Sequence, residues 1–347
     1  MTNVQTADSK KQQILEYLKQ HGPTTSKQLC AYLGVSRQAL NVHIRALINF
    51  GEIYKSGATR AAKYHLYDAA PESRRFKKTL KLANLDENQV YEQMATLLNL
   101  KSALPANLQT IVNYGFTEML NNAIDHSVAK TCNVEVSLDA AKIEFEIRDR
   151  GIGVFHSIAS RLQLEDEHVA MIELIKGKTT TMPEAHSGEG IFFSAQAADR
   201  FSLRSHQIEI VWDKFRQDTF VSQPRYLEGT RVRFSMSRSS RTRLEEVFSR
   251  FAPPEYDFEF SRTRIMIKLL KVEYISRSEA KRLVVNLEKF REVELDFREV
   301  DLVGQGFADE LFRVFQRRHP DIKIETTNTN AAVEAMIRHV VQSAGDA

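Results

Sequence analysis

The hydrophobic positions of the chain follow two different periods. Apolar residues from Ile14 to Leu18, and again from Leu40 to Ile48, recur with helical spacing. Between residues 133 and 153 the period changes to two, with alternating apolar positions at Val134, Val136, Leu138, Ile143, Phe145 and Ile147. After residue 275 a helix is followed by strand 293–297, a helix, strand 322–326 and a helix, an alternation typical of parallel strands. These patterns predict a multidomain chain of the α+β and α/β classes.

The N-terminal helical patterns are separated by turn signals. Gly22-Pro23 ends the first helix, and TTSKQLCAYLG predicts a second, with Thr24 or Thr25 as N-cap and Gly34 as its end. Ser36 caps a third helix, whose predicted inner face is Ala39, Leu40, Ile44, Leu47 and Ile48. Two short helices joined by a tight turn containing glycine form a helix-turn-helix. Its outer face carries side chains that can contact phosphates and base edges, namely Arg37, Gln38, Asn41, His43 and Arg45.

A hairpin is predicted after these helices, with Ile53 and Tyr54 before a Ser-Gly turn and Tyr64 after it. Its tip carries the basic residues Lys55, Arg60 and Lys63. Residues 1–70 therefore resemble a winged helix-turn-helix domain, which implies binding to double-stranded DNA. The alternative is a winged helix used for protein contact. The position of the basic residues, on the predicted recognition helix and wing, favours DNA.

The charge is distributed unevenly along the 347 residues. Residues 1–82 hold 14 Lys and Arg against 5 Asp and Glu, a net charge of +9, whereas the remainder holds 34 against 40, a net charge of −6. A basic N-terminal module on an acidic body favours nucleic acid over a membrane as partner. No apolar run approaches the length of a membrane span. Two distant cysteines, Cys30 and Cys132, fit a reducing cytoplasm. Residues 71–104 are expected to form a helical connector.

The stretch TEMLNNAIDHS, residues 117–127, places Glu118, Asn122 and Asp125 on one helical stripe. A carboxylate and an amide one turn apart can hold a water and a hard cation beside a triphosphate. Further on, a strand ends in a DxGxG motif, and a GxG motif precedes a helix whose N-terminal N–H groups can bind phosphate. The glycines and the residues that accompany them are Asp149, Gly151, Gly153, Gly188, Gly190, Gly229 and Thr230.

Four motifs, ExxxNxxD, DxGxG, GxG and the Gly-Thr pair at residues 229–230, occur in this order and spacing. They resemble those of the Bergerat-fold (GHKL) ATPases, which include gyrase B subunits, heat-shock chaperones, histidine kinases and MutL. The resemblance covers residues 105–240 and implies an α/β sandwich that binds ATP and Mg²⁺. It implies that Glu118 is the general base, that Asn122 holds Mg²⁺ and that Asp149 binds the adenine amino group. It also implies that Asp125 and Thr230 support the site and that Gly151, Gly153, Gly188 and Gly190 shape the pocket. Residues 154–187 would be the ATP lid, from which Lys176 and Lys178 are candidates to meet the phosphates.

Two departures from the family pattern limit the resemblance. No phosphate-contacting lysine of a transducer domain is identified, which implies slow hydrolysis. The connector contains no histidine, since none lies between His65 and His126, so autophosphorylation of the histidine-kinase type is not expected.

Residues 275–347 resemble a small STAS-like α/β domain of unknown function, related to anti-sigma-factor antagonists. Those antagonists carry a phosphorylatable serine after the first such strand. The corresponding loop here, residues 303–306, has the sequence VGQG and contains no hydroxyl group, so a phosphoswitch at this place is not expected. The resemblance makes this domain a candidate surface for a protein partner.

The leading hypothesis is a cytoplasmic DNA-binding transcriptional regulator that binds and slowly hydrolyses ATP. Its nucleotide state would control conformation or homodimerisation, because half-site spacing on DNA follows dimer geometry. The alternative is an anti-sigma-factor-like serine/threonine kinase that acts on a separate protein. Glu118 favours water activation over transfer, although such kinases carry a glutamate there too. A toxin-like or defence role, with the DNA module as a tether, stays open.

Overall fold

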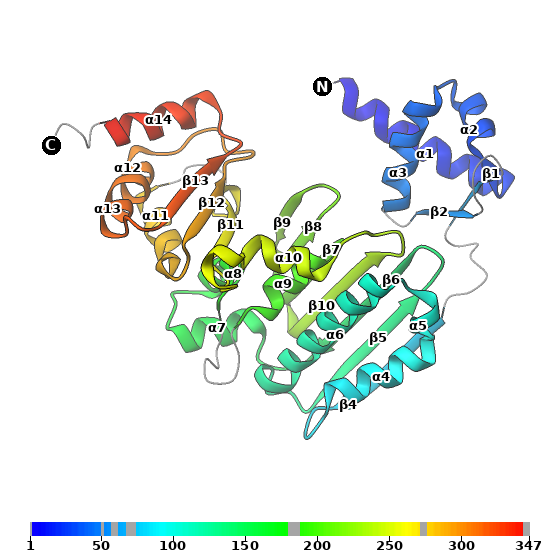
Figure 1. Cartoon of the computed structure of the whole chain (residues 1–347), viewed down its shortest axis with the longest axis horizontal. Helices are drawn as coiled ribbons and strands as arrows, with labels where there is room; N and C mark the ends of the chain where they lie inside the picture. The colour runs from blue at the N-terminus through cyan, green and yellow to red at the C-terminus, as the bar shows by residue number, and fades with distance from the viewer. Residues whose placement is uncertain are drawn as a thin grey trace.

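The computed structural model of this chain describes residues 2–49, 52–56, 62–66, 74–179, 188–270 and 276–342. Figure 1 shows an N-terminal helical part, a central sheet covered by helices, and a C-terminal α/β part beyond the other end of the central body. Among the described residues, no helix has the length and apolar character needed to cross a bilayer.

The N-terminal part is a winged helix-turn-helix in its order of elements. Its helices and strands are α1 (Thr2–His21), β1 (Thr24–Thr25), α2 (Ser26–Leu33), α3 (Arg37–Asn49), β2 (Ile53–Ser56) and β3 (Lys63–Leu66). Thr25 caps α2, and Gly34 ends it in the left-handed conformation (φ 63°). Ser36 Oγ accepts a hydrogen bond from Ala39 N–H at 3.2 Å at the start of α3. The expected hairpin is present but β1 joins it, which gives a three-stranded sheet of order β1-β3-β2. Ala39 is exposed and does not belong to the inner face.

The central part contains a seven-stranded sheet. Its elements, in chain order, are β4 (Arg74–Lys81), α4 (Glu87–Leu98), α5 (Leu100–Ala103), α6 (Ala106–His126), β5 (Thr131–Leu138), β6 (Lys142–Asp149), α7 (Val154–Leu162), α8 (Glu167–Lys176), α9 (Gly190–Ala197), β7 (Arg200–His206), β8 (Ile208–Asp213), β9 (Asp218–Ser222), β10 (Leu227–Ser237) and α10 (Leu244–Phe251). The strand order is β4-β5-β6-β10-β7-β8-β9, and every neighbouring pair is antiparallel.

One face of this sheet packs against helices, as the alternation of apolar residues predicts. Residues at every second position of β5 and β6 are buried, and α4, α6, α9 and α10 lie together on that side (Figure 1). The opposite face carries the polar residues of the same strands. In the described part of the chain, no helix covers that second face; we call it the open face.

Residues 74–81 differ from the expected helical connector. They form β4, which pairs with β5 from Arg74 opposite Leu138 to Lys81 opposite Thr131. Phe76 is buried against the core, while the lysines and arginines around it stay at the edge of the sheet. Such charges are common on edge strands because they prevent pairing with other chains. Because basic residues occupy most positions of β4, the strand lacks the alternation of apolar and polar residues that would predict it from the sequence.

The C-terminal part has a parallel sheet of order β11-β12-β13. Its elements are β11 (Arg262–Met266), α11 (Arg277–Val284), β12 (Glu292–Asp296), α12 (Gln305–Asp309), a π-helical segment (Glu310–Phe315), α13 (Gln316–Arg318), β13 (Lys323–Thr327) and α14 (Ala331–Gln342). The two predicted strands are present within one residue, and they are parallel as predicted. The strand β11, which pairs with β12, lies before residue 275, where the C-terminal domain was expected to begin.

The buried residues of the described ranges form two separate cores. One lies within the N-terminal part, from Ile14 to Tyr64. The other runs without a break from Phe76 to Val333 and therefore joins the central and C-terminal parts. Phe260 connects them, because its ring centroid lies 4.6 Å from that of Phe192 in α9 and 5.4 Å from that of Phe290.

Candidate nucleotide site and nucleic-acid interface

A cavity of about 300 Å³ lies where α6 and the N-terminus of α9 meet the end of the sheet. Six of the predicted nucleotide-site residues line it: Glu118, Asn122, Asp149, Gly188, Gly190 and Thr230. The buried side of α6 faces the sheet, which leaves its polar stripe to form the cavity wall. Sequence reasoning missed Asn121 and His126, which also line the cavity from α6. Their positions in the same helical stripe were the available signal.

Asp149, at the end of β6, is held by the backbone. Its Oδ1 accepts hydrogen bonds from the N–H groups of Gly151 (2.8 Å) and Thr230 (3.2 Å). The side chain is 4% exposed, and this burial raises the pKa of the Asp149 carboxyl despite the two backbone donors. The Thr230 hydroxyl accepts from Val154 N–H at 3.0 Å and so positions the start of α7. A fixed carboxylate at the cavity wall can accept from a ligand amino group.

The glycines of these motifs permit contacts that a side chain would prevent. A Cβ atom at Gly190 would lie 2.0 Å from Glu118 Oε2, and one at Gly151 would lie 1.8 Å from the Ser127 carbonyl oxygen. Glu118 can therefore occupy its position only because residue 190 has no side chain. Gly151 and Gly153 do not line the cavity themselves. Instead they let the loop after β6 pack against the end of α6 and against β7.

Two predicted site residues lie elsewhere. Asp125 is exposed and does not line the cavity. Lys178 also lies outside the cavity wall, and its Nζ donates to the Lys289 carbonyl oxygen at 3.0 Å, between the rings of Phe260 and Phe290. Burial there lowers the pKa of Lys178. The reason is the chain direction after α8, which turns Lys178 towards the C-terminal part and leaves its neighbour Thr179 on the cavity.

The expected lid is only partly polar. Every residue of α8 from Val169 to Lys176 is buried, because α8 packs between the rest of the central part and β11. Lys176, the other lid lysine, is 1% exposed and pairs with Glu173 at 2.5 Å. Its Nζ also donates to the Val285 carbonyl oxygen at 2.7 Å. Lys176 is thus unavailable to phosphates. Residues 180–187 lie outside the described residues.

The cavity fits Mg·ATP by its chemistry. It combines an acid and an amide on α6, the N-terminus of a glycine-led helix and a buried carboxylate. No group of three or more His, Cys, Asp or Glu side chains suited to a metal is present among the described residues. Mg²⁺ suits such a site, since it commonly takes one or two protein ligands and completes its shell with phosphates and waters. Asn122 is the residue that would hold it.

The second candidate site is the surface of α3. Arg37, Gln38, Asn41 and Arg45 are exposed on this helix. His43 is partly buried, and burial together with Lys10 and Lys11 lowers its pKa. Lys55 and Lys63 are exposed on β2 and β3. Arg60 lies outside the described residues.

The fold and the cavity define an ATPase-type domain between a DNA-binding module and an α/β tail. Comparison with known families agrees: the chain matches an HTH domain over residues 10–58, a histidine kinase-like ATPase domain over 83–212 and a STAS-like domain of unknown function over 279–334. No curated protein matches the chain. The three predicted domain families and their order are thereby confirmed. The ATPase match begins at residue 83, which supports assigning α4 to this domain.

Proposed function

We propose that this protein is a DNA-binding transcriptional regulator that binds ATP, hydrolyses it slowly and changes conformation or dimerises with its nucleotide state. The main support for the proposal is that residues 176–179 connect the cavity to the C-terminal part. Thr179 lines the cavity, while Lys178 and Lys176 bind backbone carbonyl groups of the C-terminal part. A nucleotide that moved this segment would also move the C-terminal part.

In this proposal each cavity residue has a specific task. Glu118 would accept a proton from the attacking water, and Asn122 would hold Mg²⁺. Asp149 would accept a hydrogen bond from the adenine amino group. When bound, Mg·ATP would supply the phosphoryl group, and the N–H groups at the start of α9 would stabilise its negative charge. The engagement of Lys178 with Lys289 leaves no described lysine on the cavity wall, which supports slow turnover.

The DNA module also faces the ATPase domain across a small cavity. Ile48, in the last turn of α3, lines a small cavity together with Lys142, Asp199 and Phe215 at one end of the central sheet. A shift of the ATPase domain would therefore reach the recognition helix. Nucleotide must bind one arrangement more tightly than the other for this to act as a switch.

A protein-kinase reaction is the second candidate, favoured by the STAS-like match at residues 279–334. An anti-sigma-factor-like kinase would use the same cavity but pass the phosphoryl group to a hydroxyl of a partner. The two candidates differ in where the phosphate goes.

The test is ATP turnover by the purified chain with Mg²⁺, with free phosphate and labelled protein followed together. We expect free phosphate from the wild type and a loss of about 100-fold or more in Glu118→Gln, which keeps the shape of the side chain. DNA affinity is measured in parallel with and without ATP and should differ between the two. Label on protein would instead identify a kinase, and equal DNA affinity in both states would refute the nucleotide switch.

A further inference from the structure

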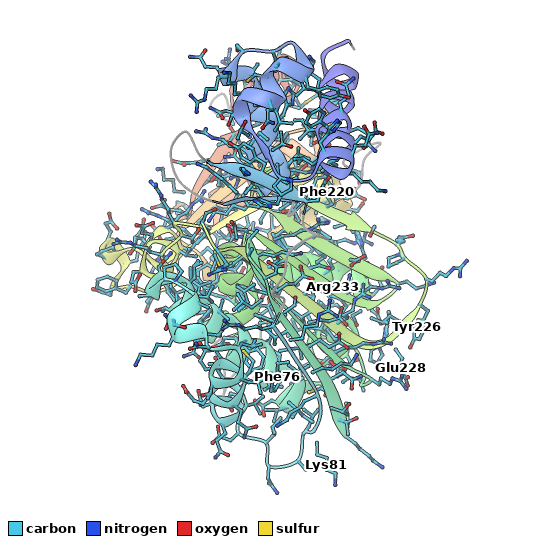
Figure 2. The ribbon with its side chains drawn as sticks, turned by 90° about the vertical axis from the view of Figure 1, so that its right-hand side faces the viewer. Phe76, Lys81, Phe220, Tyr226, Glu228 and Arg233 are labelled. Atoms are coloured by element: carbon cyan, nitrogen blue, oxygen red, sulfur yellow. The ribbon has the colours of Figure 1, made fainter. Side chains whose placement is uncertain are left out.

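Three arginines stand side by side on the open face of the central sheet. Arg231 of β10 lies directly opposite Arg148 of β6 on one side and Arg204 of β7 on the other. Directly opposed residues have Cβ atoms about 5 Å apart. We call these three residues the arginine row. Figure 2 labels Arg233, which is two residues from Arg231 along β10 and so lies on the same face.

The arginine row is poorly compensated. The Nε atoms of all three side chains are buried and have no hydrogen-bond partner among the described residues. The Arg148 guanidinium makes no hydrogen bond or ion pair with any described residue. Arg231 Nη2 reaches Glu209 Oε1 only at 3.5 Å, and Arg204 Nη2 donates to the Arg225 carbonyl oxygen at 2.5 Å. The carboxylates that act on Arg231 are those of Glu209 and Glu146, and Glu146 is also paired with Arg233.

Two other basic residues of the open face are paired with acids. Arg233 Nε lies 2.6 Å from Glu146 Oε2, and Lys77 pairs with Glu135. Within the described residues, the arginine row has a single ion pair, the 3.5 Å contact between Arg231 and Glu209. Like charges directly opposite each other on a sheet are destabilising. Burial lowers the pKa of Arg231, with Arg233 and Arg204 adding to the shift and Glu146 and Glu209 opposing it, but a guanidinium stays charged in proteins.

We propose that the arginine row binds phosphate groups of a DNA duplex held by the winged helix-turn-helix. The inference rests on the DNA binding in the proposed function. Guanidinium groups match phosphate oxygens by paired hydrogen bonds and are preferred where phosphates are recognised. A bound phosphate would supply both the missing negative charge and acceptors for the unpaired N–H groups.

The position of the row suits a duplex that leaves the recognition helix along the strands. Lys142, at the start of β6, lines the same small cavity as Ile48 of α3. Arg148 lies six residues further along β6, a distance of about 20 Å. That length corresponds to about six base pairs. An acidic protein segment is the competing occupant. DNA is favoured because phosphates that flank the recognition site can be bound whatever their base sequence, and this contact needs no partner beyond the DNA itself.

The experiment measures the affinity of the full chain for a long double-stranded DNA of arbitrary sequence by fluorescence anisotropy at several salt concentrations. The test variant is Arg148→Ala/Arg204→Ala. We expect its slope of log K against log salt to be smaller than that of the wild type by about 2, because each lost phosphate contact removes about 0.9. The free variant should also melt at a higher temperature, since repulsion within the row is relieved. If the row served only to stabilise the fold, the variant would instead melt at a lower temperature than the wild type.

The matched control is Arg317→Ala/Arg318→Ala, which removes the same charge from exposed positions of α13. Its slope should stay at the wild-type value. Arg148→Lys/Arg204→Lys, which keeps the charge, should retain most of the slope and guards against misfolding of the alanine variant.

Three results would overturn the proposal. An unchanged slope in the alanine variant, with binding still weakened by Arg37→Ala, would leave the proposed function intact and remove the row from the DNA contact. Binding to polyglutamate, a model of an acidic protein segment, is measured in the same way. If the alanine variant loses this binding while its DNA salt slope stays unchanged, the occupant of the row is an acidic protein segment. Failure of the wild type to bind DNA at any salt concentration would overturn the DNA-binding function and the row together.

Discussion

Replacing Lys176 by methionine tests how firmly α8 is held to the C-terminal part. The lysine Nζ lies 2.5 Å from Glu173 Oε1 and 2.7 Å from the Val285 carbonyl oxygen, and Asn286 Nδ2 donates to Glu173 Oε2 at 2.9 Å. Methionine preserves the volume and leaves Glu173 buried with one neutral donor. Breaking a buried pair in this way costs about 3–5 kcal/mol of the free energy of unfolding.

A double replacement separates the charge from the packing. In Glu173→Leu/Lys176→Met no buried charge remains, and the main loss is the donor to the Val285 carbonyl oxygen, about 1–3 kcal/mol. The two single replacements together should therefore cost at least about 3 kcal/mol more than the double replacement.

The assay is urea unfolding followed through Trp212, the single tryptophan of the chain. It lies on β8, with its ring 5.6 Å from that of buried Phe201, so its emission reports the core shared by the central and C-terminal parts. The melting temperature of Lys176→Met should be lower than that of the wild type by roughly 6–20 °C for a cooperative unit of this size. The inferred role of the pair would be refuted if the losses in free energy of unfolding of the two single replacements added up to that of the double replacement. It would also be refuted if Lys176→Met were as stable as the wild type.

Three further predictions concern the sites. Burial raises the pKa of Asp149, so the folded state holds its proton more tightly than the unfolded state, and this stabilisation is lost as pH rises through the raised pKa. Asp149→Asn should thus gain stability relative to the wild type as pH increases from about 4, while it loses ATP affinity. Gly190→Ala should displace Glu118 and reduce turnover by about 100-fold or more. Arg37→Ala and Arg45→Ala should each weaken DNA binding by about 1–3 kcal/mol.

Each of these has a result that contradicts it. A stability difference for Asp149→Asn that is constant with pH, measured by denaturation at several pH values, would mean that burial does not perturb the carboxyl. Full phosphate release by Gly190→Ala in the turnover assay would show that Glu118 tolerates displacement. For DNA binding, Lys19→Ala on exposed α1 is the control, and equal effects of all three variants would remove α3 as the recognition helix.

The sequence was most informative where spacing has a direct geometric meaning. Glu118 and Asn122 are one helical turn apart, and a turn brings them to the same cavity wall. Their proposed chemical tasks stay predictions. Lys178 could not be placed in this way, because its direction depends on how the chain leaves α8 and on the packing of Phe260, both set by tertiary structure. The strand β4 was missed because lysines and arginines occupy both of its faces.

The arginine row shows the same limit. Arg148, Arg204 and Arg231 are distributed over more than eighty residues of sequence, and only the register of three antiparallel strands brings them together. The register of strands that are distant in sequence depends on the complete sheet, so alternation within each strand predicts the face but not the neighbour.

The continuous core from Phe76 to Val333 has a consequence for how such proteins diversify. The chain matches three sequence families, but in the part that the structure describes its buried residues form two cores. A gene fusion that exchanged the DNA-binding module would leave the core of the central and C-terminal parts intact and would direct these parts to another DNA sequence. A recombination event between the ATPase and STAS-like segments would instead expose α8 and the ring of Phe260, so these two segments are expected to pass through evolution as one inherited unit.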